Sequence, residues 1–423
     1  MGLERPNLYS QRYNCIEETM KQSFISFKRG NSFKMIKREE GFSLVELLVT
    51  MVVFVLILTA TSNTFIDLLK DFKKQSTLAE TNIEGAVGLE TLRRDIASAG
   101  TGLPWVIATG VTYNEADNDG VTTHNDTLFN ESCFPDFTTC ANAASDTQPP
   151  HAFVSGNGTG SFGSDILSIK SVSVHTDAEA QKWTYVNSSN QVKEWTPASE
   201  NLGTSDRVIV LSLGTSDATR RTLIAVGTDF TTTYRADTNP DSLADTTGFK
   251  PTDASERYIV YGVTDDVSPV DTNLRMPFNR ADYYIQRPDN YLSTCAPNTG
   301  ALYKVKVSHV AGGVTPVMPI LDCVADMQVA FRRDEDDDGD IDNTYDGDIT
   351  TLLLTPAQIR QIKEVRVYIL AHEGQRDTSY TSPDSIRVGD ASISVGRNLD
   401  ISAANRNYRW KLYVLVVKTE NLK

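Results

Sequence analysis

The chain has 423 residues and a formal net charge of −15. It is long enough for one large or two small globular domains beyond a short anchor. The acidic balance argues against nucleic-acid binding, because phosphate recognition draws on clustered Lys and Arg. It suits a soluble, exposed surface and divalent cations.

The first predicted element is an apolar helix. Residues 41–60 read GFSLVELLVTMVVFVLILTA, a run that is long enough to cross a bilayer core of about 30 Å. The basic residues Lys37 and Arg38 precede it, and one carboxylate, Glu46, lies inside it. A carboxylate in hydrocarbon is costly and persists only with a partner or a function. The pattern therefore predicts a membrane span that carries a functional carboxylate.

The Gly-Phe-Ser-Leu-Val-Glu string at residues 41–46 resembles the class III signal of type IV prepilins. In that family a membrane peptidase cuts after the glycine, the new N-terminal residue is methylated, and the glutamate fifth from the cut assists assembly. The resemblance implies that Gly41 is the cleavage residue, that Phe42 becomes the methylated terminus, and that Glu46 pairs with an N-terminal ammonium. The alternative is an ordinary N-terminal anchor with Glu46 at the level of the lipid headgroups.

Under this interpretation residues 1–41 are a leader and form no part of the predicted fold. The part that matches the family begins at Met35 and reads MIKREEG. We predict that Met35 is the true start, with a long genuine leader as the alternative. The leader holds eight basic and five acidic residues, so the chain from Phe42 onward has a net charge of −18.

Helical periodicity continues beyond the span. Apolar residues recur at intervals of three and four with charges between them. This predicts a transmembrane or filament-core segment over residues 42–62 and an amphipathic continuation over residues 63–99. The glycines and the proline of residues 100–104 mark its end. Such a helix is roughly 85 Å long, so its first half must pack against lipid before assembly and against other subunits afterwards.

From residue 100 the composition changes to Thr, Asn, Asp, Ser and Gly, broken by short β-rich runs. This predicts an extracytoplasmic β domain with long loops over residues 100–423. Alternating apolar and polar residues predict antiparallel sheets with one face buried, which the helix's apolar stripe would cover. The expected fold class is therefore α+β. The predicted strands are 166–174, 207–213, 258–263, 283–286, 302–307, 327–331, 365–371 and 408–418.

Cys15 lies in the leader, and four cysteines remain in the part that the signal sends outside the cytoplasm. An even count in an oxidising compartment predicts disulfides, and the sequence alone permits three pairings. We favour Cys133 with Cys140 and Cys295 with Cys323. Zinc is disfavoured, because it usually needs Cys-x-x-Cys spacing or histidine partners.

The sharpest motif of the β region is an acidic loop within residues 334–348. Its first part, DEDDDGDID, places oxygen atoms at loop positions 1, 3 and 5, glycine at 6 and a carboxylate at 9. Calcium takes about six to eight oxygen ligands around a tight turn, so we predict a structural calcium site, with a solvated acidic turn as the alternative. Tyr345 stands where an EF-hand has its last glutamate, so Asp346 or Asp348 would supply the final ligand. The other predicted ligands are Asp334, Asp336, Asp338, the carbonyl of Asp340, and Asp342.

Motifs for catalysis are scarce, and we predict that the chain is not an enzyme. It has no G-x-S-x-G, H-E-x-x-H or phosphate-loop pattern. His372 follows a predicted strand and is expected at the surface rather than as a catalytic base. Core or sheet-face packing, rather than contact with carbohydrate, is the expected role of Trp105, Trp183, Trp195 and Trp410.

A second resemblance lies in four strings, which look like the PilW-type minor pilins. They are LRRDIASAG at 92–100, PILDCVADMQV at 319–329, KEVRVY at 363–368 and YRWK at 408–411. The resemblance implies a minor pilin of a type IV pilus that primes assembly, is incorporated at or near the filament tip and serves twitching motility. The implied partners are other minor and major pilins, the prepilin peptidase, the inner-membrane assembly platform and, before assembly, membrane lipid, with no nucleic acid.

The implied location is the inner membrane, with a single span and a periplasmic C-terminal domain, and the pilus or cell surface after assembly. Two alternatives share the same signal. One is a minor pseudopilin of a type II secretion system, and the other is a tip adhesin on the same architecture. Loss of pili or twitching, rather than loss of protein secretion, would separate the first alternative from a pilus function.

Overall fold

The structure is a computed structural model. It describes residues 43–116, 130, 145–146, 149–203, 206–214, 216, 219–235, 242–243, 248–264, 274–310, 317–347, 358 and 360–422. The chain divides into two compact units, Met1–Lys70 and Asp71–Lys423, and the second unit holds the β sheets.

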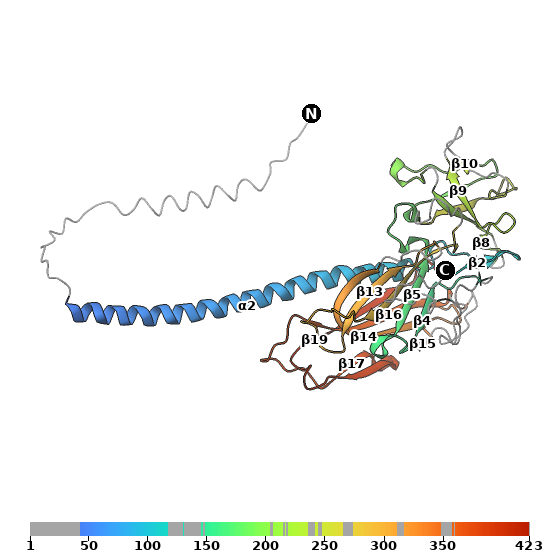
Figure 1. Cartoon of the computed structure of the whole chain (residues 1–423). Coiled ribbons are helices and arrows are strands. Elements are labelled where there is room, and N and C mark those ends of the chain that lie inside the picture. The colour runs from blue at the N-terminus through green and yellow to red at the C-terminus, as the bar shows by residue number, and fades with distance from the viewer. Residues whose placement is uncertain are drawn as a thin grey trace, which may run out of the picture. The chain divides into compact units, whose positions relative to one another are not determined.

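The long predicted helix is confirmed as α2, Leu44–Ser98 (Figure 1). Its first turn carries a reciprocal cap. The Ser43 Oγ accepts from the N–H of Glu46 at 3.2 Å, and the Glu46 carboxylate accepts from the N–H of Ser43 at 3.0 Å. Such a capping box satisfies backbone donors that a helix N-terminus otherwise leaves without partners. At the other end Gly100 takes φ +82°, the left-handed conformation that commonly ends helices.

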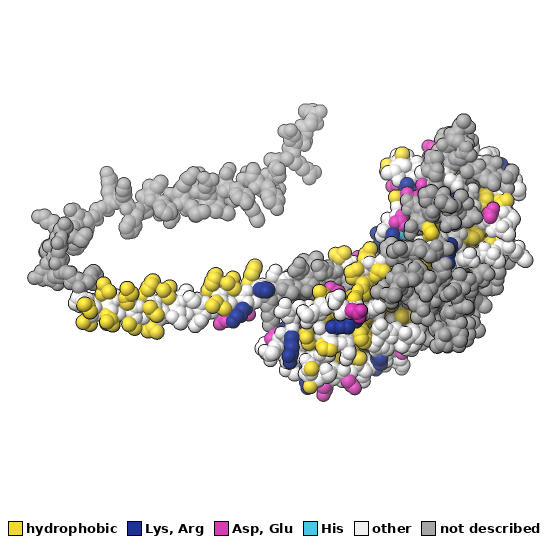
Figure 2. Space-filling model, viewed as in Figure 1, with side chains coloured by type: hydrophobic (Ala, Val, Ile, Leu, Met, Phe, Trp, Pro, Cys, Tyr) yellow, Lys and Arg dark blue, Asp and Glu magenta, His cyan; other side chains and the backbone are white. Residues whose placement is uncertain are grey.

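The first part of α2 is apolar around its whole circumference. The segment Leu44–Lys73 is long and apolar enough to cross a membrane, by length and composition. Its large hydrophobic side chains are exposed, and Figure 2 shows them gathered along this part of the helix. Because a helix that is hydrophobic all round is stable only when it is buried, this segment needs lipid or other protein around it.

The second unit contains two main sheets (Figure 1). The strands of the larger sheet are β4 (Phe153–Gly156), β5 (Ile166–Ser171), β12 (Asn279–Gln286), β13 (Gly300–Lys306), β14 (Val317–Arg333), β15 (Asn343–Asp346), β16 (Ile362–Glu373) and β19 (Arg409–Lys418). They follow the order β19-β16-β14-β13-β12-β5-β4, with β15 paired to β14. All these pairings are antiparallel.

The strands of the second sheet are β1 (Val106–Ile107), β6 (Trp183–Val186), β7 (Arg207–Ser212), β8 (Thr222–Leu223), β9 (Thr231–Arg235), β10 (Ser242–Leu243) and β11 (Tyr258–Gly262). They follow the order β1-β8-β7-β11-β6, with β9 on β7 and β10 on β9. Two strand pairs lie apart, β2 (Tyr113–Asn114) with β3 (Ser145–Asp146) and β17 (Ser385–Asp390) with β18 (Val395–Asp400). Short 3-10 helices are η3 (Ser161–Gly163), η4 (Val172–Val174), η5 (Glu179–Gln181), η6 (Ala198–Glu200) and η7 (Ala391–Ile393).

The larger sheet is covered on both faces. On one face the last turns of α2 pack through Leu89, Leu92 and Ile96 into the main hydrophobic core. On the other face the β17–β18 hairpin packs through Val388 and Val395 on residues of β14 and β16. This double cover explains why β14 and β16 are buried along most of their length.

All eight predicted strands are confirmed, and their bounds differ for physical reasons. The strand predicted over residues 166–174 ends at Ser171, because the Ser171 hydroxyl accepts from the N–H of Ser173 and caps a 3-10 turn. The strand predicted over residues 283–286 begins earlier, at Asn279. Its first residues include a fully buried ion pair of Arg280 with Asp282 at 2.8 Å, which a hydrophobicity pattern does not reveal.

The contact between helix and sheet gives a stability prediction. A Cβ at Gly88 would overlap the backbone carbonyl of Ile320, whereas a Cβ at Gly85 would meet the flexible side chain of Leu321 at 3.0 Å. We expect Gly88→Ala to lower the free energy of unfolding by about 1–3 kcal/mol, as overpacking does. Urea denaturation of the full chain in detergent, followed by tryptophan fluorescence, measures the change.

Gly85→Ala is the matched control, because it makes the same chemical change one helical turn away. We expect little net loss, since a shift of Leu321 is offset by the better helix propensity of alanine. Equal effects of the two substitutions would contradict this packing of α2 on β14.

Candidate functional site

The N-terminal site is described from Ser43 onward. Glu46 lies in the first turn of α2, within the apolar segment Leu44–Lys73. The predicted cleavage and methylation residues, Gly41 and Phe42, lie outside the described residues, so their roles stay predictions.

The second unit holds α2 through a buried polar contact. Asp95 of the helix accepts a hydrogen bond from the hydroxyl of Tyr283 at 2.5 Å and forms an ion pair with Lys304. The Lys304 ammonium also donates to the carbonyl of Val174 at 2.9 Å. Burial raises the pKa of Asp95, and the Lys304 charge opposes that rise.

The contact joins the helix to β12 and β13 at one point, because Tyr283 and Lys304 lie on those neighbouring strands. A buried ion pair whose groups are also hydrogen-bonded contributes little net stability, but removal of one partner is strongly destabilising. Asp95 therefore fixes the position of the helix on the sheet.

The acidic loop lies between β14 and β15. The carboxylate oxygens of Asp334, Asp336 and Asp338 lie within 4.8 Å of one another. Asp334 is buried at the centre, where it accepts hydrogen bonds from the N–H groups of Asp338 at 3.2 Å and Gly339 at 3.0 Å. Gly339 takes φ +100°, a conformation that glycine adopts without strain. The structure thus brings three of the predicted ligands together.

Other predicted ligands make different contacts. Asp342 lies at the loop's base, where its carboxylate accepts from the N–H of Glu335 at 2.5 Å. The Asp340 N–H donates to the Asp338 carboxylate at 2.9 Å. Asp346 accepts from the N–H of Gly396 at 3.0 Å, which directs it to the β17–β18 hairpin. Asp348 lies outside the described residues.

The charges of the loop affect Asp336. The N–H of Asp338 lowers the pKa of the Asp336 carboxyl. Desolvation and the carboxylates of Asp338, Asp342 and Asp334 outweigh this effect and raise that pKa above its ordinary value.

From β16 the Lys363 ammonium lies 2.7 Å from Asp337 and 3.8 Å from Asp334. The Arg333 guanidinium pairs with Glu335 of the loop at 2.8 Å, and Arg220, Arg360 and Lys418 line the same cavity. Carboxylates as close as Asp334, Asp336 and Asp338 nevertheless favour a bound cation.

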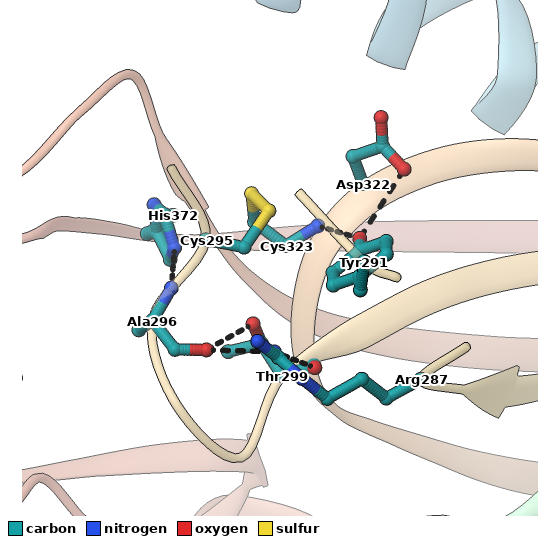
Figure 3. The surroundings of a disulfide bond; sticks show 8 residues. All are labelled: Arg287, Tyr291, Cys295, Ala296, Thr299, Asp322, Cys323 and His372. Atoms are coloured by element: carbon teal, nitrogen blue, oxygen red, sulfur yellow. Dashed lines mark hydrogen bonds between the residues drawn. A yellow bond between two sulfur atoms is a disulfide. The ribbon is translucent and has the colours of Figure 1, made fainter. Parts of the chain in front are cut away.

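The predicted disulfide between Cys295 and Cys323 is confirmed, with a Cα–Cα distance of 5.0 Å. It links the loop before β13 to a bulge in the pairing of β14 with β13, where Cys323 takes φ +55°. The hydroxyl of Tyr291 accepts from the N–H of Cys323 at 2.8 Å and donates to Asp322 at 3.2 Å (Figure 3). The Cys133–Cys140 pairing lies outside the described residues and stays a prediction.

The expectation that His372 lies at the surface was wrong. It belongs to β16 and is buried beside the disulfide, where its Nε2 accepts from the N–H of Ala296 at 2.9 Å (Figure 3). Burial lowers the pKa of His372 to about 4. The imidazole and the two sulfur atoms lie within 4.8 Å of one another, but the sulfurs are bonded to each other and cannot bind a metal as thiolates.

Sequence reasoning missed the role of Asp95, although a signal was present. The residue lies on the same helix face as Leu92, Ile96 and Ala99, all of which are buried. A single carboxylate on an apolar helix face indicates a buried partner on the surface that the face covers.

Comparisons with known proteins agree with this geometry at both ends of the chain. Residues 36–62 match the model of the prokaryotic N-terminal methylation motif, and residues 282–421 match the model of type IV pilus-assembly protein W. The second match covers the larger sheet from β12 to β19, with the disulfide and the acidic loop. No curated protein and no solved structure matches the chain.

A methylation motif at the start of a long apolar helix, followed by an antiparallel β domain, is the arrangement expected of a type IV pilin. Within that class, the match over residues 282–421 points to the PilW family. The two matches, over residues 36–62 and 282–421, are consistent with a PilW-like type IV pilin. The PilW family is a structural component of the pilus and not a family of enzymes.

Proposed function

We propose that the chain is a minor pilin of a type IV pilus, cut after Gly41 and incorporated at or near the filament tip, where it primes assembly. The observation that carries the proposal is one continuous helix, α2, whose first part is apolar and exposed and whose last part is packed on a large sheet. Such a helix can enter a filament core while the sheet stays outside it.

The size of the β domain favours a minor role. A major subunit repeats at a small axial spacing along the filament, so a domain of the size of residues 100–423 would crowd its neighbours. At the tip the same domain has free space above it. The proposed orientation places this domain in the periplasm before assembly and on the pilus afterwards.

The proposed partners follow from the exposed segment Leu44–Lys73. Before assembly its side chains contact membrane lipid, and the prepilin peptidase and the inner-membrane platform act on the chain there. After assembly other pilins replace the lipid. In the filament Glu46 neutralises an N-terminal ammonium, either its own or a neighbour's, and so sets the axial register.

A complementation experiment tests the assembly role. In cells that lack the protein, we expect the wild-type chain to restore surface pili and Glu46→Ala to fail, because an N-terminal ammonium would then be buried without its partner. Electron microscopy gives the number of pili per cell, and immunoblotting confirms equal amounts of protein.

Glu90→Ala is the matched control, since Glu90 is an exposed glutamate on the same helix that forms a surface pair with Arg93 at 3.5 Å. It should restore pili fully. Normal piliation with Glu46→Ala would refute the proposed register contact. Loss of protein secretion with normal pili in the deletion strain would assign the chain to a type II secretion filament instead.

We also propose that the acidic loop binds one structural calcium ion. Asp334, Asp336 and Asp338 would supply carboxylate oxygens, with the carbonyl of Asp340 and the carboxylate of Asp342 completing the predicted set. The proposal is supported by the short distances among the first three carboxylates and by their mutual repulsion. The loop lines an open cavity of about 1080 Å³, so a hydrated cation can reach it.

Calcium removal gives the test of this site. At free calcium about 100-fold above the dissociation constant, binding to the folded state alone would stabilise the chain by about 2.7 kcal/mol. We expect the unfolding midpoint to fall when EDTA is added and to recover with calcium. Asp338→Asn should abolish the calcium-dependent difference.

Asp337→Asn is the control, because it removes the same charge from the adjacent position, which the predicted ligand set leaves out. It should keep the calcium response. If the wild-type chain has equal midpoints in EDTA and calcium, or if both substitutions act alike, the loop is a solvated acidic turn.

A further inference from the structure

An aromatic cluster lies at the edge of the second sheet, on β6. Thr184 and Val186 of this strand are buried, so the alternating residues Trp183 and Tyr185 face the other way. The ring centroids of Trp183 and Trp195 are 4.9 Å apart, and those of Trp183 and Tyr185 are 5.4 Å apart. Trp183 is 39% exposed, which leaves a large aromatic surface in contact with solvent.

Backbone contacts hold the second indole in place. The Nε1–H of Trp195 donates to the carbonyl of Trp183 at 2.7 Å. The side chain of Asn201 accepts from the N–H of Trp195 at 2.6 Å and donates to its carbonyl at 3.2 Å. The indole face is therefore fixed before any ligand arrives, and a preorganised site loses less conformational entropy on binding.

The two tryptophans line a cavity of about 380 Å³ with a polar rim. The cavity lies among η5, β6 and η6, and its other lining residues are Ala178, Gln181, Lys182, Ser199 and Glu200. Its volume and its mix of aromatic and polar groups fit a small-molecule site. The lining has one basic and one acidic charged residue, so it offers no net charge to an ionic ligand.

We propose that this cavity binds a neutral carbohydrate. A sugar ring has an apolar C–H face, which can stack on an indole, and hydroxyls around its edge, which can hydrogen-bond with the amide, hydroxyl and charged groups of the rim. A quaternary ammonium ligand fits less well, because the Lys193 ammonium already lies 6.0 Å from the centroid of the Trp195 ring and would repel a second cation. An anionic ligand would require an excess of basic residues.

From the sequence, Trp183 and Trp195 were expected to pack rather than to contact carbohydrate. They do pack against each other on a sheet face, but Trp183 remains exposed beside the cavity. The proposed carbohydrate binding is separate from filament assembly. It does not depend on which filament contains the chain.

The test uses the full chain in detergent. We expect it to bind at least one neutral oligosaccharide on an array of glucose, galactose and N-acetylglucosamine oligomers. Titration of that oligosaccharide by calorimetry should show affinity lowered about tenfold or more by Trp183→Ala, and largely kept by Trp183→Phe, which retains an aromatic face. Ser199→Tyr should also block binding, because it fills the cavity from an exposed position without removing a packed side chain.

Phe162→Ala is the matched control, since Phe162 is 37% exposed and lies outside the cavity lining. It should bind as the wild-type chain does. The proposal is overturned if the wild-type chain binds no neutral oligosaccharide, if it binds only charged glycans, or if both Trp183→Ala and Ser199→Tyr bind with wild-type affinity.

Discussion

The structure depends on one constraint: the first part of α2 needs lipid or other protein around it, while its last turns are buried in the chain's own core. The segment Leu44–Lys73 exposes its large apolar side chains, and each such side chain gains about 1.5–3 kcal/mol when it is removed from water. The gain must come from lipid or from other subunits. By contrast, the last turns of the same helix are buried through Leu92 and Ile96 in the chain's own core.

The polar contacts of the second unit make this division possible. Asp95 joins the helix to Lys304 and Tyr283, and Gly88 lets the helix approach the backbone of Ile320. These contacts fix the last turns of the helix on the sheet. The disulfide joins β14 within its length, at Cys323, and the acidic loop follows its last residue, Arg333, so both act on one interior strand of the larger sheet.

Much of the fold could be predicted from the sequence, because periodicity is a local property. The apolar run and the stripe after it predicted α2, and short β-rich runs predicted eight strands. Where charged side chains are buried in pairs, as in Arg280 with Asp282, hydrophobicity underestimated the strand. His372 was misplaced because its burial depends on a hairpin loop and a disulfide that are distant in sequence.

The sequence also predicted two of the candidate sites, the N-terminal signal and the acidic loop. The string at residues 41–46 identified the N-terminal signal, which the methylation-motif match supports, and the acidic spacing identified a loop whose carboxylates do gather. The cavity beside Trp183 could not be predicted, because it needs three segments that only the fold brings together.

The most direct test of the account is the intact mass and N-terminal sequence of the protein from cells with and without the prepilin peptidase. The account predicts a chain that begins at methylated Phe42 in the presence of the peptidase and a chain that retains its leader in its absence. The same leader-bearing chain from both kinds of cell would contradict it, and the apolar helix would then be a plain membrane anchor.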